Sequence, residues 1–233
     1  MQLGFQLPWL WRMGLLPRPR ITRRHEGVRK TMRLMLPAIF GSSITQLNLL
    51  LDTILASFLI AGSVSWLYYS DRLVEFPLGM FGVALATVIL PKLSREYSSS
   101  NGADFNQTLD WGLRLTVLLA LPATAGLTLL AGPLLATLFQ YGEFSAHDTA
   151  MAQLSLIAYS LGLPGFLLIK VLAPGFYARQ DTTTPVKIGI RAVLANLAFK
   201  AAVVVPMILL AIPGTHAALA AATAFAAWLN AWW

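Results

Sequence analysis

The sequence contains no cysteine, and only 12% of its 233 residues are charged. The lack of cysteine excludes disulfides, cysteine-ligated metals and thiol chemistry in this chain. Its three histidines, His25, His147 and His216, are far apart and show no metal-ligand spacing. The sequence also lacks a Walker A motif, an HExxH motif, a Rossmann glycine fingerprint and a Ser/His/Asp constellation. We therefore expect no enzyme activity, no cofactor and no metal site.

Apolar residues dominate the chain instead, at 57% of the sequence and a mean hydropathy of +0.66. They gather in stretches long enough to cross a bilayer as helices: 36–60, 66–90, 111–138, 149–172, 188–211 and a sixth that begins near His216. We predict an all-α polytopic membrane helix bundle, truncated at both ends. Residues 1–12 are expected to end a preceding helix, 13–33 to form a basic cytoplasmic linker, and 34–233 to form about six membrane helices, the last incomplete.

The net charge of +7 is compatible with nucleic acid binding, but the positions of the basic residues favour membrane lipids. The loops alternate in charge along the chain: 12–33 basic, 61–65 without a positive charge, 92–95 basic, 140–148 acidic and 179–191 basic. Basic loops of membrane proteins lie in the cytoplasm. The alternation therefore supports the predicted spans, and anionic lipid headgroups explain the basic residues better than nucleic acid does.

Three charged residues lie in the second apolar stretch: Asp71, Arg72 and Glu75. A span that began after them, at Phe76, would run only about 22 Å to Leu90, well short of a hydrocarbon core of about 30 Å. The helix must therefore begin near Trp66 or Tyr68. This start places the charges below the membrane surface, where each unpaired charge costs roughly 2.5 to 3.5 kcal/mol or more.

The spacing of these charges allows two interpretations. Arg72 and Glu75 are one turn apart, and Asp71 shares a face with Glu75. A guanidinium offers a fork of donors that matches phosphate, so Arg72 is a candidate for binding a diphosphate headgroup in a water-filled cavity. The alternative is an internal ion pair that only neutralises charge.

The first span carries a polar stripe at steps of four, three and four residues: Gly41, Thr45, Asn48 and Asp52. Such a stripe on an apolar helix must face the bundle interior, and a carboxylate there is paired, protonated or bound to a cation. Lys200 lies near the middle of the 188–211 stretch, one turn after Asn196. Two alternatives stay open: an Asp52–Lys200 ion pair, or independent side chains that face water.

Proline and glycine interrupt the expected helices, for example at Gly162, Pro164 and Gly165. Small residues allow close helix packing in membranes, and proline with glycine can also form hinges. The loop RQDTTTPVK (179–187) is polar and carries Pro185 near its end. We expect Asp181 or Thr184 to cap the helix that follows.

Three segments together resemble the MurJ (MviN) family of lipid II flippases, which belongs to the MOP exporter superfamily. They are SDRLVEFPLGMFGVALATVILPKLS (70–94), VLAPGFYARQDTTTPVKI (171–188) and ALAAATAFAAWLNA (218–231). The resemblance implies a fold of fourteen membrane helices, of which this chain would supply the end of helix 6, helices 7 to 11 and part of helix 12. It also implies movement of undecaprenyl-diphosphate-linked peptidoglycan precursor across the bacterial inner membrane by alternating access.

The resemblance assigns roles to particular residues. The family's cavity arginine and its nearby glutamate match Arg72 and Glu75, with Asp71 beside them and Ser65 at a cavity-facing position upstream. The resemblance also implies that some family members bind sodium, through a carboxylate that matches Asp52. Its further ligands would match Asn196 and Thr223.

Lys200 stands where that resemblance would place a second acidic ligand. A fixed ammonium competes with a sodium ion electrostatically, so we predict no sodium site here. We expect Lys200 to take the place of the cation.

These expectations favour a lipid II flippase of the inner membrane, with contacts to cell-wall synthesis proteins as a further expectation. One alternative is a multidrug or other MOP-type antiporter, whose cavity would favour acidic and aromatic residues for cationic drugs. Another is a flippase for exopolysaccharide precursors on the same carrier. The third is a membrane scaffold that transports nothing and recruits synthesis enzymes.

Overall fold

A computed structural model describes residues 12–13, 26–99, 102–210 and 212–233. This described part contains helices and no strand, which confirms the expected all-α fold. The helices are α2 (Glu26–Ser57), α3 (Ser63–Pro77), α4 (Val83–Ser98), α5 (Gly102–Leu129), α6 (Ala131–Phe139), α7 (Ala146–Ala178), α8 (Thr183–Phe199), α9 (Val205–Leu209) and α10 (Thr215–Trp232). Two π-helical segments, η1 (Leu78–Gly82) and η2 (Lys200–Val204), join α3 to α4 and α8 to α9. The chain divides into two compact units, Met1–Leu36 and Pro37–Trp233, and the contacts below belong to the second.

Four of the described helices are long and apolar enough to cross a membrane: Ser63–Ser98, Gly102–Leu129, Ala146–Ala178 and Thr183–Leu209. The third apolar stretch differs from its expected bounds of 111–138, because the helix ends at Leu129 and a short helix follows. Pro133 explains the break, since proline lacks the N–H that would continue the helix and its ring collides with the carbonyl one turn earlier. The helical ladder resumes with the Leu134 N–H donating to Leu130.

The structure begins α2 at Glu26, so residues 26–33, expected in the basic linker, are helical. Residues 1–11 and 14–25, where the preceding helix and the rest of the linker were expected, lie outside the described residues. Of the predicted polar stripe, Gly41 and the side chain of Thr45 are likewise not described.

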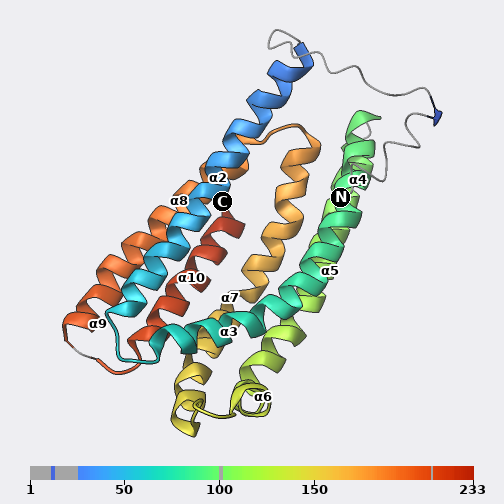
Figure 1. Cartoon of the computed structure of the whole chain (residues 1–233). Coiled ribbons are helices and arrows are strands. Elements are labelled where there is room, and N and C mark those ends of the chain that lie inside the picture. The colour runs from blue at the N-terminus through green and yellow to red at the C-terminus, as the bar shows by residue number, and fades with distance from the viewer. Residues whose placement is uncertain (1–11, 14–25, 100–101, 211) are drawn as a thin grey trace. The chain divides into compact units, whose positions relative to one another are not determined.

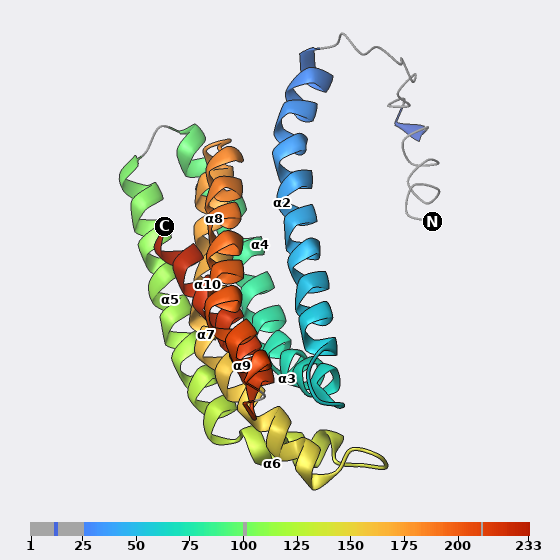
Figure 2. The same cartoon turned by 90° about the vertical axis from the view of Figure 1, so that its left-hand side faces the viewer.

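The central helix is α7, which packs against α3, α4, α5, α6 and α10. Figure 1 shows α10 between α7 and α8, and Figure 2 shows α5 running along α7. The α7–α10 contact is close because α7 carries glycine where the two backbones meet. A Cβ atom on Gly162 would lie 2.6 Å from the Ala224 Cα, and one on Gly165 would lie 3.0 Å from the backbone of Ala227. These glycines therefore serve packing.

The helix that runs through α3 and α4 changes direction at η1 (Figure 1). Proline and π-helical turns are the usual causes of a sharp helix bend, and Pro77 stands directly before this segment. Along α3, one face is buried, with Trp66, Ser70 and Val74 at steps of four residues. The polar side chains of Arg72 and Glu75 lie on the other face, half exposed.

The polar loop after α7 is ordered by Asp181. The Asp181 Oδ1 atom accepts hydrogen bonds from the backbone N–H groups of Thr183 and Thr184, both at 3.0 Å. The Thr184 hydroxyl donates to Oδ2 at 2.6 Å. The N-cap position of α8 is Thr182, and of the two candidates it is Asp181, the residue before it, whose side chain accepts from the first N–H groups of the helix. Hydrogen bonds from Thr184, and then from Thr183, lower the pKa of the Asp181 carboxyl below its usual 3.8.

We expect Asp181→Ala to reduce the free energy of unfolding by about 1 kcal/mol, the usual effect of losing a helix cap. The lowered pKa gives the effect a pH dependence. The contribution of the charged cap is complete above the unfolded-state pKa and is lost as the pH falls through the folded-state pKa. The difference between the parent and Asp181→Asn should therefore shrink from neutral pH to about pH 3. Thermal unfolding in detergent measures both. Asp110→Ala, at an exposed i,i+4 pair on α5, is the control and should change little.

Candidate functional site

Polar side chains gather in two places, and the first is the exposed face of α3. This α3 cluster consists of Ser65, Tyr68, Asp71, Arg72 and Glu75. The Arg72 Nη1 atom donates to Glu75 Oε2 at 2.5 Å, and the guanidinium lies over the Tyr68 ring, 4.8 Å from its centroid. The internal ion pair considered from the sequence is therefore present. Both of its side chains stay half exposed, at 51% and 50%, so the pair does not remove the guanidinium from solvent.

The other two members of the α3 cluster extend it in different directions. Ser65 is exposed two turns before Arg72 on the same face of the helix. Asp71 is half-buried and lies within electrostatic range of Glu75, Arg72 and Asp52. Asp71 thus stands between the exposed cluster and a second, buried group of polar residues.

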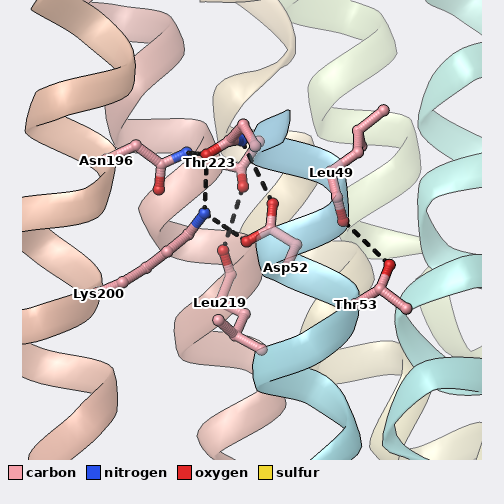
Figure 3. A network of polar contacts seen from close by, with 8 residues as sticks. Leu49, Asp52, Thr53, Asn196, Lys200, Leu219 and Thr223 are labelled. Carbon is pink, nitrogen blue, oxygen red and sulfur yellow. Dashed lines mark hydrogen bonds and ion pairs between the residues drawn. The ribbon is translucent and has the colours of Figure 1, made fainter. Parts of the chain in front are cut away.

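The second place, called here the buried network, consists of the buried Asn196 and Lys200 with the partly buried Asn48 and Asp52. Figure 3 shows Asp52, Asn196 and Lys200 of this network. The Lys200 ammonium, only 2% exposed, forms an ion pair with the Asp52 carboxylate. Of the two alternatives left open by the sequence, the structure has the ion pair. Lys200 is the first residue of η2, where its carbonyl accepts from the Val205 N–H five residues on. Such π-helical turns occur often at functional sites.

Asn48 links both charges of the pair. Its Oδ1 atom accepts hydrogen bonds from Lys200 Nζ at 3.2 Å and from Asn196 Nδ2 at 3.4 Å. Its Nδ2 atom donates to Asp52 Oδ2 at 3.4 Å. The amide thus presents its oxygen to two donors and its nitrogen to the carboxylate, which fixes its orientation. Buried charges are stable only when they are paired and hydrogen-bonded in this way.

The geometry disagrees with a sodium ion at this network. The Lys200 ammonium already contacts the carboxylate of Asp52 and the amide oxygen of Asn48, the kinds of oxygen ligand that a cation would use. The hydroxyl of Thr223, the other position that the resemblance suggested, donates to the Leu219 carbonyl of its own helix at 3.3 Å. A second cation at this network would therefore be repelled by the first.

A cleft of about 640 Å³ borders the network on α8 and α10, and its lining is mostly apolar. Asn48, Asn196, Thr223 and Asn230 are among its polar lining residues. The Asn196 Oδ1 atom is buried and makes no hydrogen bond within the part of the chain that the structure describes. The cleft and the network therefore share Asn48 and Asn196, although this oxygen of Asn196 is not itself exposed to solvent.

The structure also brings together three residues that the sequence did not single out as a group: Trp66, Asp148 and His216. The Trp66 indole Nε1 donates to Asp148 Oδ1 at 2.7 Å, and its ring packs on His216 with centroids 4.9 Å apart. From the sequence, Trp66 marked only the beginning of a helix. Trp66 stands at steps of four residues from Ser70 and Val74, and this sequence pattern could have indicated that it is buried.

Comparison with known proteins shows which family this chain resembles. The family model described as "Lipid II flippase MurJ" matches residues 1–233. The chain is 51% identical over 238 residues to the "Probable lipid II flippase MurJ" of Haemophilus influenzae, covering 100% of this chain and 45% of the relative. It is 51% identical to the protein of the same name from Vibrio cholerae, covering 98% of this chain and 42% of the relative.

A solved structure, "Lipid II flippase MurJ, inward closed conformation", matches with a TM-score of 0.74 and 26% identity. The match covers 99% of this chain and 47% of that one. The chain thus spans less than half the length of these relatives and of this solved structure. These matches confirm the resemblance carried by the three segments, and the chain belongs to the lipid II flippase MurJ family.

Proposed function

We propose that the full-length protein containing this chain flips lipid II from the cytoplasmic to the periplasmic leaflet of the bacterial inner membrane by alternating access. It acts as a transporter and not as an enzyme. Family membership supports the substrate, because the relatives are named for it. The observation that carries the proposal is the half-exposed Arg72 guanidinium on the polar face of α3.

The α3 cluster suits a diphosphate headgroup for a chemical reason. A guanidinium has five N–H donors, and the pair with Glu75 engages its Nη1. The phosphate oxygens of the substrate can bind the rest of the fork in a bidentate way. Glu75 is then an internal competitor, since its carboxylate can take the guanidinium back when the substrate leaves. In this proposal Arg72 binds the diphosphate, and Glu75 weakens the binding enough for release.

The buried network supplies a different function in this proposal. Lys200 provides a fixed positive charge beside Asp52, so this site holds its own cation and takes no sodium ion from solution. Asp71, within range of both Arg72 and Asp52, connects the two sites electrostatically. Contacts with cell-wall synthesis proteins stay a prediction.

The rivals differ in the chemistry that they require. An exposed guanidinium repels cations, so it is unfavourable in a cavity that binds cationic drugs. An exopolysaccharide precursor carries the same diphosphate and would use Arg72 equally well, so the sugar must decide. A scaffold would need no exposed cation at all.

The proposal can be tested with a chimaera in which this chain replaces the matching segment of the Haemophilus influenzae relative. The chimaera is reconstituted in vesicles with fluorescent lipid II, and flipping is followed by the access of a membrane-impermeant quencher. We expect lipid II to cross faster than in protein-free vesicles. An exopolysaccharide precursor on the same carrier and a lipophilic cation should cross more slowly. Transport of the cation alone would contradict the proposal, and equal transport of both lipids would remove its sugar specificity.

A further inference from the structure

Trp66 at the first turns of α3 joins three helices. Its side chain is 2% exposed, and its indole N–H donates to Asp148 in the first turn of α7 at 2.7 Å. Its ring meets the edge of His216 in the first turn of α10. His216 itself is 1% exposed, and its Nε2 lies 3.0 Å from the carbonyl oxygen of Met151 in α7. A carbonyl only accepts, so this nitrogen is the donor.

The acceptor of the indole is itself held in place. Asp148 and Ser145 form a capping box at the start of α7, in which the Asp148 carboxylate accepts from the Ser145 N–H and the Ser145 hydroxyl accepts from the Asp148 N–H. A capped carboxylate has little freedom to follow a moving partner. The Trp66 side chain is thus tied to a fixed point on the central helix.

Ser70 makes a second tie one turn further along the same face. It is fully buried, and its hydroxyl oxygen lies 2.7 Å from the Trp66 carbonyl and 2.7 Å from the Ala152 carbonyl of α7. One hydroxyl hydrogen serves both acceptors. The two ties are one turn apart on α3 and meet the same helix. They therefore resist rotation of α3 about its own axis.

Rotation of α3 matters because its two faces carry different residues. At about 100° per residue, Arg72 points about 200° away from Ser70, close to the opposite side of the helix. A rotation of α3 would move the guanidinium toward the packed side and bring the buried Val74 outward.

We propose that Trp66 and Ser70 are positioning residues, which lock the rotation of α3 on α7 so that Arg72 stays on the exposed face of α3, where the proposed function places the headgroup. This inference rests on the proposed function, because it treats Arg72 as the headgroup ligand. Neither residue touches the substrate in this proposal. They act through the direction in which α3 presents its charged face.

The residue before α3 fits the same arrangement. Gly62 has a φ of 100°, in the left-handed region, and a Cβ there would lie 2.8 Å from the Trp66 ring. A side chain at position 62 would therefore collide with the anchor as well as strain the turn. Gly62→Ala offers a second way to displace Trp66 without changing it.

Cysteine accessibility tests the proposal, and the absence of native cysteine from this chain makes it practical. Arg72→Cys and Val74→Cys are made separately in the chimaera, after removal of any cysteine from its other part, and each is labelled with a membrane-impermeant maleimide. In the parent, position 72 should react much faster than position 74. With Trp66→Leu and Ser70→Ala together, the ratio of the two rates should fall by about tenfold, the size expected for losing a hydrogen bond to a charged group.

Further variants separate the anchor from a general loss of packing. Trp66→Phe keeps most of the ring but loses the indole N–H, so its labelling ratio should lie between those of the parent and the double variant. Gly62→Ala should shift the ratio in the same direction as the double variant. Trp111→Leu changes a half-exposed tryptophan on α5 and should leave the ratio unchanged.

The labelling ratio also separates this inference from the proposed function. If Trp66→Leu with Ser70→Ala keeps the parent's ratio in a folded protein, the positioning inference is wrong, whatever happens to transport. If the ratio changes as expected but the parent chimaera does not move lipid II, the inference about α3 stands and the proposed function fails. If the double variant does not fold, the labelling ratios measured with Trp66→Phe and Gly62→Ala test the positioning inference.

Discussion

Arg72→Ala in the chimaera is expected to lower the initial rate of lipid II flipping by a factor of about 100 to 1,000, the effect of losing two charge-assisted hydrogen bonds to phosphate. Arg72→Lys should keep part of the activity, because an ammonium supplies the charge without the planar fork. Stability should change little, since the Arg72–Glu75 pair is half exposed and screened by solvent. Flipping in vesicles and thermal unfolding in detergent provide the two readouts.

Two variants sharpen this test. Arg114→Ala removes an exposed arginine that has an i,i+4 acidic partner on α5. This variant should flip lipid II at the parent rate. Exchanging the charges, with Arg72→Glu and Glu75→Arg together, keeps a neutral pair but moves the guanidinium along the helix. A scaffold would tolerate the exchange, whereas we expect the flippase to lose activity. Normal flipping by Arg72→Ala would remove the headgroup role.

Lys200→Met should reduce the free energy of unfolding by about 3 to 5 kcal/mol, the usual effect of leaving one buried charge without its partner. The methionine fills most of the volume of the lysine stem, so the loss reports charge more than packing. Asp52→Asn with Lys200→Met removes both charges and should recover most of the stability. Chemical or thermal unfolding in detergent measures the cycle.

Alanine variants of the same two residues test the absence of a sodium site. If Lys200 takes the place of the cation, replacing choline chloride by sodium chloride should leave the stability of the parent unchanged. Lys200→Ala opens space beside the Asp52 carboxylate, and sodium should stabilise this variant more than the parent. Sodium stabilisation of the parent, lost in Asp52→Ala, would be the contrary result.

Features that depend on a single segment of the chain could be predicted from the sequence. Apolar stretches and alternating loop charges predicted a helical membrane protein, because bilayer thickness fixes the length of a span. The spacing of Arg72 and Glu75 placed them on one face, and the ion pair between them is a contact within a single helix. Asp181 was likewise one of two neighbouring capping candidates.

The contacts between helices could not be predicted in the same way. Asp52 and Lys200 were both expected inside the bundle, but their meeting depends on how α2 and α8 are rotated and how far each is shifted along its axis. Hydrophobic periodicity gives the inward face of each helix and leaves those two quantities open. The contact of Trp66 with Asp148 could not be predicted for the same reason. The break of the third span at Leu130 was missed because proline is common within membrane helices and only sometimes ends one.

The backbone contact of α7 with α10 at Gly162 and Gly165 constrains how these two helices can move relative to each other. Helices in such close approach resist sliding, because a shift along the axis would bring residues larger than glycine against the opposite backbone. If the full-length protein works by alternating access as proposed, its motion would carry both helices together as one rigid body. Hinge bending between this body and the rest of the protein would then be favoured over shear between α7 and α10.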